Sequence, residues 1–235
     1  HYARIENGFL MRGVDPTKDQ SYFLFAMGES VLPQVHFPLG GWRKEAVRER
    51  ARELKLPNWD APDSVELCFV GGRSHADVVE QQAQARGLDT SNLDSGSIVD
   101  SSGKVVGTHR GIHTVTVGQR RGLRVAGTEA RYVLRVLPES RKVVVGGADE
   151  LTRSKLLLRD LRWFGERPSG AIRGSVQIRH RTPASMATVE VDGDTARVCF
   201  DEPVRAVAPG QAGVIYAGDR VLGGGWIEVP PEATS

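Results

Sequence analysis

Residues 66–73 read ELCFVGGR and combine an apolar run, two glycines and a cysteine. The apolar run from Val65 to Val70 predicts a short buried strand, which a pair of glycines ends. Ser74 follows as the expected N-cap of a helix. Cys68 would therefore lie near a strand end, a helix start and Arg73. Because helix N-termini and cations lower the pKa of a thiol, this setting favours a reactive thiolate; the alternative is that Cys68 is a buried apolar side chain.

The length of 235 residues suits one large domain or two ordinary ones. The chain carries 31 Lys and Arg against 29 Asp and Glu, and this net charge of +2 neither requires nor excludes nucleic acid. Any RNA affinity must therefore come from local clusters of arginine. The chain opens at His1 in strand-like sequence without an initiator methionine, so we expect that something upstream has been removed.

Cysteine usage and hydropathy indicate the compartment. The two cysteines, Cys68 and Cys199, form no C-x-x-C pair, which argues against a disulfide framework and against a zinc site. This pattern favours a reducing cytoplasm. No apolar run approaches the length of a membrane span, so we expect no membrane partner.

The first 60 residues predict a hairpin and two helices. Asn7-Gly8 joins the strand candidates 2–5 and 9–12. A helix begins after the polar cluster at 18–21, with Asp19 or Ser21 as its cap. Capping alone does not require Lys18, Asp19 and Gln20 together, so this cluster either faces a ligand or is an exposed first turn. Residues 44–56 predict an amphipathic helix that Pro57 ends.

After a helix that ends near Gly87, the residues from 97 to 227 predict strands and no helix. Short strands separated by turn residues are typical of a sandwich or a barrel. The strand candidates are 97–99, 104–106, 113–117, 131–137, 142–145, 156–163, 174–181, 187–191, 195–200, 213–216 and 220–227. Asp192-Gly193 is the strongest hairpin signal, and we place a domain break between about residues 146 and 155.

Several clusters of residues are candidate sites. His109 and His113 are four residues apart in a predicted strand, where they would be separated by roughly 13 Å, so we expect no metal site. Gly223 to Gly225 lie in a strand region and form no dinucleotide fingerprint. Arg120 and Arg121 between glycines, and the run 179–181 (Arg-His-Arg), are candidate phosphate contacts.

Six motifs in order resemble the C-terminal two-thirds of bacterial tRNA-specific 2-thiouridylases. They are DPTKDQSYFL (15–24), FPLG (37–40), CFVG (68–71), VGQRRGL (117–123), PGQ (209–211) and LGGG (222–225). The resemblance implies tRNA 2-thiolation. Family members use ATP, with Mg, to adenylate the C2 oxygen of the wobble uridine and replace that oxygen by sulfur from a cysteine persulfide.

The resemblance also implies a fold: an α/β remnant of an ATP-pyrophosphatase-type domain, a small central domain and an all-β C-terminal barrel. We expect these at 1–73, 74–150 and 151–235, with 36–57 as an alternative part of the central domain. The barrel would bind tRNA.

By the same resemblance, Cys68 carries the persulfide, and the partners are tRNA and a sulfur-donating protein. The implied tRNA contacts are His1, Lys18, Asp19, Gln20, Arg179, His180 and Gln211. The family's phosphate loop and second catalytic cysteine have no match here, so we expect that the ATP site is not contained in this chain and that this piece alone is inactive. Cys199 does not match the missing cysteine and is expected in the core.

Two other functions remain open from the sequence. One is a tRNA-binding module without catalysis, and the other is a stand-alone persulfide carrier that uses Cys68.

Overall fold

A computed structural model describes residues 1–62, 74–123, 125 and 130–228 of the chain. The described residues form two compact units. The first contains residues 1–62, 153–204 and 208–228, and the second contains the described part of 74–152 together with 205–207. The predicted Cys68 strand lies outside the described residues. Within the described ranges, no helix is both long and apolar enough to cross a membrane.

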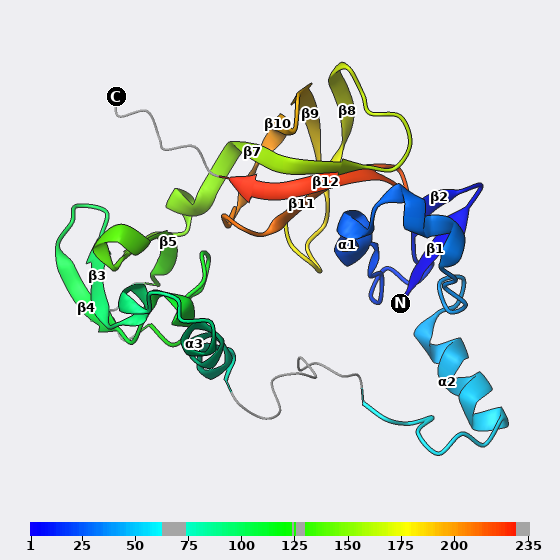
Figure 1. The fold of residues 1–235 in the computed structure, drawn as a ribbon, viewed down its shortest axis with the longest axis horizontal. Coiled ribbons are helices and arrows are strands. Elements are labelled where there is room, and N and C mark those ends of the chain that lie inside the picture. The colour runs from blue at the N-terminus through cyan, green and yellow to red at the C-terminus, as the bar shows by residue number, and fades with distance from the viewer. Residues whose placement is uncertain (63–73, 124, 126–129, 229–235) are drawn as a thin grey trace. The chain divides into compact units, whose positions relative to one another are not determined.

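Six strands of the first unit close into a barrel, in the order β12-β11-β8-β9-β10-β7 and back to β12. They are β7 (Thr152–Trp163), β8 (Gly170–Gln177), β9 (Ser185–Asp192), β10 (Thr195–Arg205), β11 (Ala212–Ala217) and β12 (Arg220–Glu228). The barrel closes because β12 pairs with β11 on one side and with β7 on the other (Figure 1). Closure leaves these strands without a free edge. The expected all-β C-terminal barrel is thereby confirmed.

Two expectations for this unit are corrected. The strand expected at 174–181 ends at Gln177, because the chain turns: Arg181 has a φ of 66°, and the Thr182 hydroxyl donates to the Arg179 carbonyl at 2.7 Å. Cys199 is only half-buried, because the alternation of β10 turns Val198 and Phe200 inward and Cys199 to the other face.

The N-terminal hairpin extends this sheet to eight strands. Strands β1 (Ala3–Glu6) and β2 (Phe9–Arg12) are joined at Asn7-Gly8, whose φ angles of 51° and 80° are those of the predicted turn. Strand β2 pairs with β12, where Met11 lies opposite Arg220. The hairpin is therefore part of the barrel sheet.

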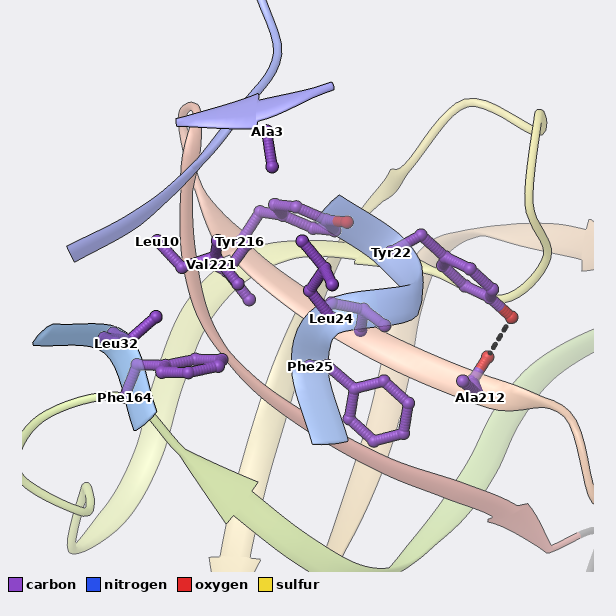
Figure 2. Close-up of a cluster of buried hydrophobic side chains, with 11 residues drawn as sticks. Ala3, Leu10, Tyr22, Leu24, Phe25, Leu32, Phe164, Ala212, Tyr216 and Val221 are labelled. Atoms are coloured by element: carbon purple, nitrogen blue, oxygen red, sulfur yellow. Dashed lines mark hydrogen bonds between the residues drawn. The ribbon is translucent and has the colours of Figure 1, made fainter. Parts of the chain in front are cut away.

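The short helix α1 (Ser21–Leu24) and the 3-10 turn Phe25–Met27 pack their apolar side chains onto the barrel. Figure 2 shows this cluster, in which Tyr22, Leu24 and Phe25 face side chains of the hairpin and the barrel. Gly224 of β12 is required here, because a Cβ would come within 2.9 Å of the Phe25 ring and 2.7 Å of the Gly213 carbonyl oxygen. A second 3-10 helix, Glu29–Gln34, adds Leu32. The cluster fixes α1 against β11 and β12.

Helix α2 (Lys44–Glu53) confirms the predicted helix, although it is shorter than expected. The chain leaves the helix at Lys55, which has a φ of 55°, before Pro57. Val47 and Ala51 are half-buried, while Leu54 is 56% exposed.

The second unit holds helix α3 (His75–Ala85) and a four-stranded sheet in the order β4-β3-β6-β5. Its strands are β3 (Gly96–Asp100), β4 (Val105–His109), β5 (Tyr132–Leu137) and β6 (Lys142–Gly146). Strands β3 and β6 are parallel, and the other pairs are antiparallel. The predicted cap is confirmed: Ser74 accepts from the Asp77 amide, and Asp77 accepts from the Ser74 amide.

The strand expected at 113–117 is wrong. Residues Ile112–Thr114 form a 3-10 turn, closed by the Thr114 hydroxyl on the Gly111 carbonyl at 2.6 Å. The Nε2 atom of His113 is hydrogen-bonded to the Glu80 carboxylate of α3 at 2.8 Å. The His109 ring bonds on both sides to backbone, to the Gly111 amide and the Arg141 carbonyl oxygen, each at 3.1 Å. Both histidines therefore make hydrogen bonds within the second unit.

Candidate nucleic-acid interface

The loop between β2 and α1 is shaped by its two aspartates. Asp15 is 3% exposed, and its carboxylate accepts from the amide and hydroxyl of Thr17 at 2.9 and 2.7 Å. It also accepts from the Lys44 amide at 3.0 Å, one of the amides left without a helical acceptor at the start of α2. Chiefly the Lys44 bond, and then the Thr17 hydroxyl, lower the pKa of Asp15. The ionised Asp15 carboxylate thus connects the loop to the start of α2.

Asp19 holds the other end of the loop. Its carboxylate accepts from the amides of Gly13 and Ser21, at 2.9 and 3.1 Å, and from the Ser21 hydroxyl at 2.9 Å. It also pairs with Arg12 at 3.0 Å, and the Asp19 side chain is only 8% exposed. The expected cap at Asp19 or Ser21 is wrong, because the N-cap of α1 is Gln20, which makes no side-chain capping bond. Asp19 precedes the N-cap and accepts from the Ser21 amide, the first amide of α1.

A chain of contacts leads from Asp19 to the turn after β8. The Arg12 guanidinium lies 3.6 Å above the Tyr216 ring and donates to the Gln177 side-chain oxygen at 3.1 Å. The Gln177 side-chain nitrogen then donates to the Arg179 carbonyl oxygen at 3.2 Å. Gln177 is 5% exposed, and a polar side chain buried to this degree needs partners. Arg12 and Gln177 therefore position the turn that carries Arg179 and His180.

Gln20 connects the loop to the N-terminal strand. Its side-chain oxygen accepts from the Tyr2 amide at 3.1 Å, and its own amide donates to the Tyr2 carbonyl at 2.9 Å. His1 is exposed and directly precedes Tyr2. The pair of bonds brings His1 to the side of the Lys18 to Gln20 segment.

Gln211 is connected to α1 through Tyr22. The Tyr22 hydroxyl donates to the carbonyl of Ala212 at 2.9 Å (Figure 2). Burial raises the pKa of Tyr22 to about 12, so the hydroxyl keeps the proton that it donates. The backbone of Gln211 is held by Ala208 and Ile227, while its side chain is exposed.

The structure thus brings seven sequence-predicted contacts into one unit: His1, Lys18, Asp19, Gln20, Arg179, His180 and Gln211. Asp19 and Gln20 bond within the protein and shape the loop, whereas His1 and Gln211 are exposed. The pattern of the sequence did not identify Arg12, Gln177 or Tyr22 as supports. The available signal is Gln177 itself, a polar residue between Val176 and Ile178 in a predicted strand.

Arg120 and Arg121 lie in the second unit, and both are exposed. Their turn is held by Gln119, whose side chain accepts from the Thr116 amide at 3.0 Å and donates to the Arg121 carbonyl at 2.9 Å. The turn is joined to β5 by backbone bonds of Gly118 and Gln119 with Val133. Both cations are therefore presented to solvent.

The other expected site residues have different outcomes. Cys68 lies outside the described residues. Among the residues that the structure describes, no group of three His, Cys, Asp or Glu side chains could hold a metal ion. Gly223 to Gly225 lie inside β12, where a Cβ on Gly223 would come within 2.2 Å of the Arg162 carbonyl oxygen. Backbone fills the space that a phosphate would need, so these glycines do not fit ATP.

Comparison with known families divides the chain into three parts. Residues 1–72 match the tRNA methyl transferase HUP domain, 89–147 the tRNA methyl transferase PRC-barrel domain, and 153–227 the aminomethyltransferase beta-barrel domain. These matches define a multidomain protein of the tRNA-modifying class and confirm the expected fold class.

The curated relatives are more specific. The tRNA-specific 2-thiouridylase MnmA of Solibacter usitatus is 42% identical over 239 residues, which cover 97% of this chain and 64% of the relative. Those of Acidithiobacillus ferrooxidans and Geobacter metallireducens are 43% and 42% identical, with 65% and 62% of their length covered. The chain belongs to the tRNA-specific 2-thiouridylase family, and it spans less than two thirds of the length of these relatives.

Proposed function

We propose that this chain binds tRNA through the first unit, as part of a protein that forms 2-thiouridine in tRNA. The observation that carries the proposal is the bonded connection between the Lys18 to Gln20 loop and the Arg179-His180 turn. A preorganised turn presents its cations at a low entropic cost, which favours binding of phosphate. The choice of tRNA as the ligand rests on the relatives, which are named tRNA-specific 2-thiouridylases.

The chemical role falls to Cys68. In this proposal Cys68 carries the sulfur as a persulfide that a donor protein in the cytoplasm supplies. The anion of this group, rather than its neutral form, is the nucleophile that attacks the uridine. Adenylation of the uridine by ATP with Mg is the family's way of activating the C2 oxygen. We assign no step of that ATP chemistry to the described residues.

Binding is tested by measuring the dissociation constant of the 235-residue chain for a tRNA transcript with a wobble uridine at several salt concentrations. For Arg179→Ala we expect weaker binding and a salt slope that is smaller by about 0.7–0.9, the contribution of one phosphate contact. Arg197→Ala is the matched control, because Arg197 is exposed on β10 and pairs with Glu190 at 3.3 Å. Equal salt slopes for the parent chain and Arg179→Ala would show that Arg179 makes no phosphate contact in the complex.

Catalysis is tested by tRNA 2-thiolation in the complete natural polypeptide. Cys68→Ser should abolish 2-thiouridine formation and leave tRNA affinity unchanged. Unchanged thiolation would rule out the role of Cys68. A tRNA-binding module would bind without thiolation, and a stand-alone carrier would accumulate a persulfide on Cys68 without tRNA.

A further inference from the structure

Phe23 is the exposed member of helix α1. Its neighbours Ser21, Tyr22 and Leu24 are buried, whereas Phe23 is 53% exposed. Single exposed apolar residues are common on protein surfaces, so exposure alone indicates no function. What distinguishes Phe23 is the arrangement of rings around it.

Two rings fix the orientation of the Phe23 ring. The His180 ring lies 4.5 Å away between centroids, at an angle of 47°, and the Tyr22 ring meets Phe23 edge to face at 5.4 Å. Tyr22 is itself anchored by its hydroxyl bond to Ala212. The Phe23 ring is therefore held in place while half of its surface remains in solvent, so a flat ligand could stack on it at little entropic cost.

Two arginines flank His180 in the sequence. His180 belongs to the turn that also carries Arg179 and Arg181, and Arg181 is exposed. The Arg179 guanidinium is close enough to act on the Tyr22 phenol, whose pKa it lowers against the larger effect of burial. An aromatic face next to arginines is the combination with which proteins hold unpaired nucleotides, stacking the base and neutralising its phosphate.

We propose that Phe23, supported by His180 and Tyr22, is the stacking surface for one unpaired base of the bound RNA. The inference rests on the proposed function, since it assigns a contact within the same interface. A peptide could also cover the ring, but the adjacent arginines favour an anionic occupant.

The test compares three variants of the 235-residue chain on two probes, the tRNA transcript and a fully paired RNA duplex. Phe23→Leu keeps the bulk and removes the π face, and Phe23→Trp keeps the face. Leu88→Ala is the control, because Leu88 is 58% exposed and lies in the second unit. Thermal melting confirms that each variant is folded.

We expect Phe23→Leu to bind tRNA on the order of 10-fold to 100-fold more weakly, the range measured for the loss of one stacked base. The salt slope should not change, because stacking releases no counterions. Phe23→Trp should restore affinity, and duplex binding should be the same for all variants. An equal loss on both probes would overturn the proposal.

The two hypotheses fail in different ways. If the parent chain binds tRNA and Phe23→Leu binds it equally well, the stacking proposal is wrong and the proposed function stands. Contact with a protein partner would then be the remaining explanation for the exposed ring. If the parent chain does not bind tRNA, both are wrong.

Discussion

Two turns of this chain carry neighbouring arginines, and they are supported in different ways. The Arg179 turn (residues 179–182) is supported from a distance, by Gln177, Arg12 and Asp19. The Arg120 turn (residues 116–122) is supported locally, by the Gln119 side chain and by backbone bonds to β5. In the sequence the two clusters look alike. The difference is that the first turn is part of a buried polar network and the second is not.

This difference has an energetic consequence. Polar groups in a buried network depend on one another, because each lost partner leaves another group without its hydrogen bond. A substitution at one end of the Asp19 network should therefore affect the Arg179 turn as well as stability. The Arg120 turn should respond only to local changes.

The largest effect is expected for Asp19→Asn. It removes the charge that pairs with Arg12 and weakens the bonds to Gly13 and Ser21. We expect a loss of about 3 kcal/mol in the free energy of unfolding, the low end for breaking a buried ion pair. Urea unfolding measures this loss, and tRNA affinity should fall with it.

The matched control for this change is Asp219→Asn. Its carboxylate is 64% exposed and reaches Arg4 at 3.5 Å, so the expected loss is about 0–1 kcal/mol. Similar losses for the two variants would show that the Asp19 network is no stronger than a surface pair.

The next effect is expected at Gly40, which packs the loop before α2 onto β1. A Cβ there would come within 1.6 Å of the Ala3 carbonyl oxygen, whereas a Cβ on Gly41 would meet nothing within 4 Å. We expect Gly40→Ala to lower the unfolding free energy by about 2–3 kcal/mol, the cost of overpacking. Gly41→Ala should be nearly neutral in the same urea titration, and a neutral Gly40→Ala would contradict the packing of the hairpin.

The elements predicted well from the sequence are those with a local cause. The turn at Asn7-Gly8 needs only two positive φ angles, and the cap at Ser74 needs only the residue three places on. The strand expected at 113–117 fails for a related reason: its β-branched residues fit a strand, but the Thr114 hydroxyl closes a turn on Gly111 instead.

The supports of the candidate site could not be predicted in this way. Arg12 and Gln177 are 165 positions apart, and their contact depends on the pairing of β2 with β12. No local pattern encodes that pairing. The Lys18 to Gln20 cluster and the run 179–181 are candidates from the residues alone, whereas His1 and Gln211 are available only through the family resemblance. Cys68, on which the sulfur chemistry rests, stays a prediction.

A smaller effect is expected at Asp15, and it depends on pH. The folded pKa of Asp15 lies below the ordinary value of 3.8 for this side chain, so its bonds to Lys44 and Thr17 stabilise the fold above that value. This contribution is lost as the pH falls through the lowered folded pKa. At pH 7 we expect Asp15→Asn to cost about 1–2 kcal/mol.

Urea unfolding of the parent chain and of Asp15→Asn at pH 7 and at pH 3 measures this dependence. The difference between the two chains should shrink at the lower pH. A difference that is the same at both values would mean that the carboxylate charge is not what holds the start of α2.

The smallest effect is expected for Gln119→Ala in the Arg120 turn. The change removes the two side-chain bonds to Thr116 and Arg121, but water can replace them because the turn is exposed. We expect a loss of about 1 kcal/mol or less, with faster hydrogen exchange at the Thr116 amide and an unchanged rate at the Gly118 amide, which donates to Val133. A loss as large as that of Asp19→Asn would mean that the Arg120 turn is also held by a cooperative network, and the distinction between the two turns would disappear.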